Sequence, residues 1–230
     1  MIKRIFRSES DLYNLSLKRT VSPDQGINLD YKKIVVNKPW GYEYLLFENK
    51  YVAIWVLCLK KNSATSMHCH PNKKTSLIVL SGMITASTLD TEFVLSPLDA
   101  LVIDSGVFHS SRSVSDDETF LIEIETPPNK NDLVRLKDQY GRENKSYEGS
   151  AFMSDKLDEY NYCDFHSQTL DEESKGERSL VGRCIQLISG PIDNILDDKI
   201  FKTNNPRFCL VEGSIVDEHG RMLLGVGEVV

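Results

Sequence analysis

The chain has 230 residues, of which 40% are hydrophobic, enough for one sizeable core and part of a second. Its formal net charge of -7 argues against a nucleic-acid partner, because binding along a polyanion depends on an excess of Lys and Arg. No apolar run reaches the roughly 20 residues of a membrane span, and the basic start of the chain leads into polar residues rather than a signal-peptide core. Five cysteines without a CxxC pair indicate free thiols, so we expect a cytoplasmic protein without a nucleic-acid or membrane partner.

The predicted elements begin after an N-terminal arm, residues 1–33. From residue 34 the sequence predicts short antiparallel strands separated by turns, with no amphipathic helix that would favour a parallel α/β fold. The strands are expected at residues 42–47, 52–59, 76–80, 84–88, 100–103 and 119–125. Alternation within these strands assigns the barrel core to Ile54, Val56, Ile78, Leu80, Leu101 and Ile103. We therefore expect an all-β jelly-roll barrel over residues 34–142.

Two histidines, His68 and His70, lie two residues apart in an apolar strand context. Side chains alternate along a strand, so both imidazoles are expected on one face, whereas Cys69 points to the opposite face. Imidazole is the commonest protein ligand for first-row metals, and His109 is the candidate third ligand. For His109 alone, a hydrogen-bonded polar residue is the more frequent alternative. The pattern predicts one divalent metal ion (Zn, Mn, Ni or Fe) held by three histidines.

Two carboxylates close the strand region. Glu123 and Glu125 alternate with Ile122 and Ile124, so both are expected on one face of the last strand. If this face lines the barrel, burial would raise the two pKa values toward the range that acid–base catalysis uses. The alternative is a solvated outer face.

Beyond the barrel, the sequence becomes less regular. Asp132 is expected to cap a short helical turn at residues 133–136. Residues 143–178 are interpreted as a linker that includes a charged loop at 171–178, and residues 179–230 as a small β unit. In this unit, residues 210–216 and 227–230 resemble residues 79–85 and 98–101. This internal similarity indicates either an ordinary hairpin with a turn at 217–220 or an incomplete second barrel.

Four blocks in order carry a resemblance to a known family: Lys38-Pro39-Trp40-Gly41, His68-x-His70 followed by Gly82, residues 99–109 ending in His109, and residues 132–142. They resemble the cupin superfamily, and more narrowly the cupin domain of type II mannose-6-phosphate isomerases, often fused to mannose-1-phosphate guanylyltransferases. The resemblance covers about residues 34–147. Two positions depart from the pattern: Thr75 stands where the family has a metal-binding Glu, and Ser105 where it has Pro. The departure at Thr75 implies a weaker metal site, or one completed by Glu123, Glu125 or water.

The resemblance implies a metal-dependent isomerase or epimerase that acts on a sugar phosphate or nucleotide-linked sugar in surface polysaccharide biosynthesis, and we expect a homodimer. Aldose–ketose isomerisation needs a base and a group that stabilises charge on oxygen. The candidate catalytic residues are Glu123, Glu125 and Arg135. The candidate substrate contacts are Lys74, Arg112, Arg142, Tyr140 and Trp40.

Two other functions stay open at this point. A three-histidine face without a carboxylate also suits an Fe(II) dioxygenase of the cupin superfamily. A non-catalytic sugar-binding or regulatory cupin would keep the barrel and lose the chemistry, and fold alone does not exclude it. Metal content and oxygen consumption separate the enzyme classes.

Overall fold

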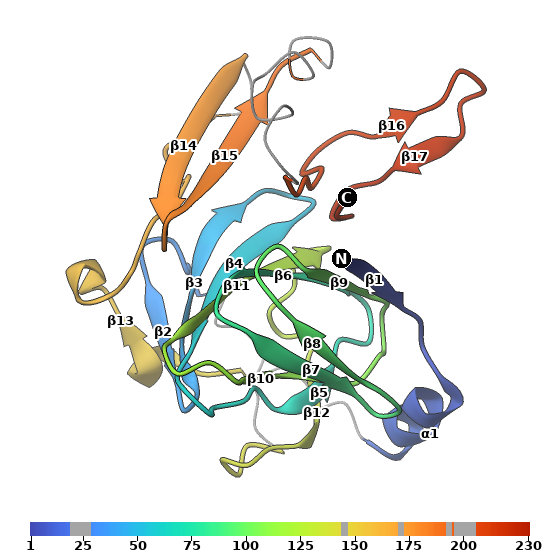
Figure 1. The fold of residues 1–230 in the computed structure, drawn as a ribbon, viewed down its shortest axis with the longest axis vertical. Helices are drawn as coiled ribbons and strands as arrows, with labels where there is room; N and C mark the ends of the chain where they lie inside the picture. Colours follow the sequence, from blue (N-terminus) through green and yellow to red (C-terminus); the bar gives the residue numbers. More distant parts are fainter. Residues whose placement is uncertain (19–28, 144–146, 170–172, 192–194, 196–205) are drawn as a thin grey trace.

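The computed structural model describes residues 1–18, 29–143, 147–169, 173–191, 195 and 206–230. Two antiparallel sheets face one another and form the body of the molecule (Figure 1). The larger sheet has the order β1-β9-β6-β11-β4-β3-β2-β13, and the smaller has the order β12-β5-β10-β7-β8. The parallel pair β1–β9 is the exception to the antiparallel pairing. The predicted all-β, jelly-roll architecture is confirmed.

The strands of the larger sheet are β1 (Ile2–Ile5), β2 (Val35–Lys38), β3 (Gly41–Glu48), β4 (Ala53–Leu59), β6 (Lys74–Ser81), β9 (Ala100–Ile103), β11 (Thr119–Thr126) and β13 (Met153–Ser154). Those of the smaller sheet are β5 (Met67–Cys69), β7 (Ile84–Thr88), β8 (Glu92–Leu95), β10 (His109–Ser113) and β12 (Val134–Lys137). Two hairpins follow, β14 (Ser174–Leu180) with β15 (Arg183–Ser189) and β16 (Ile215–Val216) with β17 (Met222–Leu224). The helical elements are α1 (Glu9–Leu17) and the 3-10 turns η1 (Ser150–Phe152) and η2 (Leu157–Glu159).

The N-terminal segment is built into the barrel. β1 adds to β9, and α1 begins at a capping box in which the Ser8 side chain accepts from the backbone N–H of Asp11. The carboxylate of Asp11 in turn accepts a hydrogen bond from the backbone N–H of Phe108, at 2.9 Å. This bond fixes the chain just before β10. Within the described residues, no helix is long and apolar enough to cross a membrane.

The larger sheet is apolar on both faces, and this overturns part of the predicted core. Between the sheets lie Trp55, Leu57, Leu59, Leu77, Val79, Leu101 and Ile103. The predicted core residues Ile54, Val56, Ile78 and Leu80 lie instead on the outer face, where the C-terminal part of the chain covers them. Alternation identifies which residues share a face, but two apolar faces leave undetermined which of them is interior.

The C-terminal part of the chain covers that outer face. Phe165, Leu180, Leu187 and Val229 are buried in the same cluster as the outer residues of β4, β6 and β11. In Figure 1 both C-terminal hairpins lie beyond the larger sheet. β16 and β17 form a hairpin, which was one of the two alternatives for this region, and its turn is closed by the hydrogen bond from the Gly220 N–H to the Asp217 carbonyl.

Two local predictions were wrong. Residues 133–136 do not form a helical turn, because Val134 and Arg135 pair with Cys69 and His68 in the sheet. Of the expected charged loop at 171–178, residues 174–178 lie in β14, paired with β15, and Asp171 and Glu172 lie outside the described residues. In both places pairing with a neighbouring strand outweighs the local polar or helical preference.

Candidate metal centre and catalytic pocket

Three histidines converge on the smaller sheet, as the sequence predicted. His68 on β5 lies directly opposite His109 on β10, and His70 follows β5. The ring centroids are 4.6 Å apart for His68 and His109, 5.0 Å for His68 and His70, and 5.5 Å for His70 and His109. One ligand atom from each ring lies within 4.8 Å of the other two. Among the described residues, no carboxylate joins this group.

Backbone carbonyls fix the protonation of all three rings. The Nδ1 atoms of His68, His70 and His109 lie 2.8, 2.6 and 2.9 Å from the carbonyl oxygens of Ser66, Asp132 and Val107. A carbonyl only accepts, so each Nδ1 carries the proton and each Nε2 keeps its lone pair for a ligand.

Burial keeps these rings neutral. It lowers the pKa of His109 to about 4, and those of His68 and His70 well below their usual value. The Nε2 atom of His70 is buried, with no hydrogen-bond partner in the described structure. Three neutral imidazoles with converging lone pairs fit a divalent metal ion.

Asp132 holds the His70 side of the centre in place. Its carboxylate accepts hydrogen bonds from the backbone N–H groups of Asn72 and Lys73, at 2.8 and 3.1 Å, and from the Asn72 side chain, at 2.7 Å. Its backbone carbonyl is the partner of His70. Asp132 therefore caps the loop after β5 rather than a helix.

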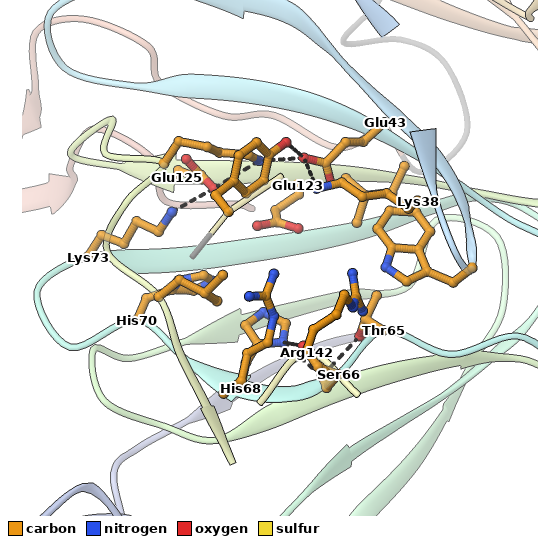
Figure 2. Close-up of a pocket in the computed structure, with 16 residues that line it drawn as sticks. Lys38, Glu43, Thr65, Ser66, His68, His70, Lys73, Glu123, Glu125 and Arg142 are labelled. Carbon is orange, nitrogen blue, oxygen red and sulfur yellow. Dashed lines mark hydrogen bonds and ion pairs between the residues drawn. The ribbon is translucent and has the colours of Figure 1, made fainter. Parts of the chain in front are cut away.

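The wall opposite the histidines carries the two predicted carboxylates (Figure 2). Glu123 and Glu125 both point from β11 into the cavity, so the inward orientation is the one observed. Burial, together with the charge of Glu125, raises the pKa of Glu123 to about 7. Burial alone would also raise the pKa of Glu125, but Lys130 and Lys73 lower it below its usual value. The Lys73 Nζ lies 2.6 Å from Oε1 of Glu125. One carboxylate is thus ionised, and the other titrates near neutral pH.

Five cationic side chains line the same cavity: Lys38, Lys73, Lys130, Arg135 and Arg142. Lys130 contacts Glu43 at 2.9 Å and lies 3.6 Å from the centroid of the Trp55 ring. Lys130 and Lys38 lower the pKa of Glu43 to about 2, against the effect of its burial. The sequence reasoning missed Lys38, Glu43, Lys130 and Tyr147 as pocket residues. Glu43 was detectable as an acid within an otherwise apolar strand, whereas Lys130 and Tyr147 come from irregular segments with no pattern.

The predicted substrate contacts divide into two groups. Trp40 and Arg142 line the cavity, as does the candidate catalytic residue Arg135. Trp40 is placed there by Gly41, where a Cβ would lie 1.9 Å from the carbonyl oxygen of Cys58. The other three predicted contacts do not line it. Lys74 is exposed because it alternates with Lys73, Arg112 is exposed and donates to the Asn62 carbonyl, and Tyr140 packs against the interior cluster.

Thr75 is buried on β6 directly opposite Glu125 on β11. Its hydroxyl has no hydrogen-bond partner in the described structure, and neither has Oε2 of Glu125. The position where the resembled family has a carboxylate ligand is therefore polar and buried, but uncharged. The nearest carboxylate across the strand pair is that of Glu125.

Comparisons with known proteins give partial structural matches. No family model and no curated protein matches the chain. A sugar phosphate isomerase of the cupin superfamily from Silicibacter pomeroyi DSS-3 matches with 14% identity and a TM-score of 0.36, over 38% of this chain and 59% of that one. A protein from Klebsiella pneumoniae with a double-stranded β-helix domain matches with 14% identity and a TM-score of 0.39, over 52% of this chain and 92% of that one. The capsular polysaccharide assembling protein CapF from Staphylococcus aureus matches with 18% identity and a TM-score of 0.41, over 45% of this chain and 32% of that one. At these identities and scores, the activity of this chain has to be argued from its own residues.

Proposed function

We propose that this protein is a metal-dependent isomerase or epimerase of the cupin type that acts on a sugar phosphate or a nucleotide-linked sugar. One observation carries the proposal: a buried carboxylate with a pKa of about 7, Glu123, shares a cavity with the histidine centre. Moving a proton between adjacent carbons requires a base that also returns the proton, and such a group works best when its pKa is near the working pH.

The residues of the pocket divide the work. Glu123 has no ion pair within the described residues, so its carboxylate is the group that accepts the proton from the carbon beside the carbonyl and returns it to the neighbouring carbon. The hydroxyl proton on the first carbon passes to the former carbonyl oxygen, so the carbonyl group changes place. Glu125 is held ionised by Lys73 and raises the pKa of Glu123 through its charge. Arg135 lines the same cavity and adds positive charge on the side held by Glu148. A divalent metal on the three histidines would supply Lewis-acid polarisation of the substrate oxygen that becomes negative.

The cavity suits a small anionic substrate. Five cationic side chains line it, against the three acids Glu43, Glu123 and Glu125, although the whole chain is acidic. Trp40 offers a flat wall for a sugar ring. The role in surface polysaccharide biosynthesis is supported by the family resemblance of residues 34–147.

Hydrogen exchange tests the proposal. Protein purified without added metal is analysed for bound metal and then incubated in D2O with a panel of sugar phosphates and sugar nucleotides. We expect deuterium at the carbon next to the carbonyl of one of them, measured by mass spectrometry. Glu123→Gln should abolish exchange and keep the metal, whereas His68→Ala should lose both. Stoichiometric metal with no exchange on any compound would contradict the proposal.

The histidine centre also supports a second candidate, an Fe(II) dioxygenase, because no carboxylate joins the three histidines in the described part of the chain. Bound iron together with oxygen consumption would favour it. Zinc, manganese or nickel with hydrogen exchange and no oxygen demand favours the isomerase. Tight sugar binding with neither reaction would indicate a binding module.

A further inference from the structure

Glu148 lies just beyond the barrel segment and is buried against three cationic side chains. Its Oε1 lies 2.6 Å from Nη1 of Arg142 and 3.6 Å from Nη2 of Arg135, and its Oε2 pairs with the Lys38 Nζ. These cations come from β2, from β12 and from the segment after β12. The Glu148 carboxylate thus forms ion pairs with three separate parts of the chain.

The three cations reach the cavity, but Glu148 does not. Lys38, Arg135 and Arg142 all line it, whereas Glu148 holds them from outside the lining. Asp138 also binds Arg142 from behind, at 3.0 Å to Nε and 2.8 Å to Nη2. Acids outside the lining therefore fix the cations, and on the cavity side the Lys38 Nζ also lies 3.5 Å from Oε1 of Glu43.

Tyr147 fastens the same segment to Glu43 and Lys38. Its hydroxyl donates to Glu43, and the Lys38 Nζ lies 3.7 Å from the centroid of its ring. Tyr147 thus adds to the lining that the barrel strands build, and Glu148 supports that lining from outside.

We propose that Lys38, Arg135 and Arg142 form a subsite for a phosphate monoester, and that Glu148 is the positioning residue that aligns these cations and limits the affinity of the subsite. Several fixed cations suit a dianionic phosphate, and arginine adds planar donors for its oxygens. The charge of Glu148 opposes that of the entering anion, so it keeps binding weak enough for release. That the phosphate belongs to a sugar substrate rests on the proposed function, whereas the subsite itself is testable with inorganic phosphate.

The proposal predicts opposite effects for two substitutions. Glu148→Gln keeps the shape but removes a negative charge close to the subsite, so the Kd for phosphate should fall by about tenfold. Lys38→Met removes one cation, so the Kd should rise by a similar factor. In the exchange assay, Glu148→Gln should lower both KM and kcat, because the phosphate of substrate and product binds more tightly and the product is released more slowly. A merely structural role would not tighten binding.

The experiment is calorimetric titration of the full-length protein with inorganic phosphate, with Glu159→Gln as the control. Glu159 pairs with Lys156 on the surface, and its loss should leave the Kd unchanged. Unchanged or weaker phosphate binding in Glu148→Gln would overturn the proposal. If Glu148→Gln does not fold, Lys38→Met decides: a weaker Kd supports the subsite and an unchanged Kd overturns it.

Two further measurements distinguish phosphate binding at the subsite from binding to the metal and from general binding of anions. His68→Ala disrupts the metal centre, so phosphate binding that vanishes in this variant but survives Lys38→Met would place the anion on the metal and overturn the subsite. Acetate, a monoanion, should bind at least about tenfold more weakly than phosphate, and equal binding would overturn the phosphate assignment. Intact phosphate binding without hydrogen exchange would refute the proposed reaction and leave the subsite standing.

Discussion

Replacing Asp132 by Ala should weaken metal binding at the candidate centre without changing any of its three histidines. The substitution removes the carboxylate that holds the N–H groups of Asn72 and Lys73, but it keeps the backbone carbonyl that accepts from His70. The carbonyl is placed against the ring because the carboxylate fixes the loop after β5. Without the carboxylate, we expect the His70 ring to lose its fixed orientation.

The magnitude follows from the bonds that are lost. Three hydrogen bonds end on this carboxylate, at 2.8, 3.1 and 2.7 Å. Bonds to a charged group contribute about 1.5–3 kcal/mol each, and water replaces part of them here, so the free energy of unfolding should fall by about 3–4 kcal/mol. Loss of a group that orients a metal ligand typically weakens metal binding by about 10–100-fold, and we expect that range. Asp132→Asn keeps one accepting oxygen and should lose about half as much stability.

Urea unfolding of the metal-free protein and competition titration with a zinc-binding dye measure the two effects. Asp217→Ala is the matched control, because this carboxylate also accepts from two backbone N–H groups and one side chain, but in an exposed turn. The control should lose less than about 1 kcal/mol and keep its zinc affinity. If Asp132→Ala loses stability but binds zinc like the wild type, the reasoning about His70 is refuted.

Three other predictions concern Glu123, position 75 and the C-terminal part of the chain that covers the outer face of the larger sheet. Hydrogen exchange by the wild type should rise with pH through about pH 7, because Glu123 with its pKa of about 7 accepts a proton only when ionised, and a flat pH–rate profile would contradict its role. Thr75→Glu should lower the unfolding free energy of the metal-free protein by about 1–3 kcal/mol through a second buried acid opposite Glu125, and should tighten zinc binding by about tenfold or more. Unchanged zinc affinity in calorimetry would show that position 75 does not reach the metal. A chain ending after Arg142 should aggregate or bind hydrophobic dyes, because the outer face of the larger sheet loses its cover, and a folded monomer would contradict this.

The shared face of His68 and His70 was predictable because its rule is local. His68 and His70 share a face through the period of the strand, and pairing of β5 with β10 brings His109 opposite His68. The inward position of Glu123 and Glu125 was predictable only as a shared face, because both faces of β11 are buried. The missed strand β10 consists of five polar residues after Phe108 and has no apolar alternation, so only its partners β5 and β7 define it.

The cationic wall was not predictable, for a different reason. Lys38 and Glu148 are 110 positions apart, and their contact depends on how the segment after the barrel returns to the edge of the larger sheet, where β13 pairs with β2. Charge at such positions is ordinarily solvated, so composition alone favours the surface for each of them. Burial makes these charges depend on one another, because a buried cation requires an anionic partner. The partner then determines where the cation points. Two features therefore determine the pocket. The period of the strands places the histidines and the carboxylates on its walls. The tertiary path of an irregular segment places the charges that would face a phosphate.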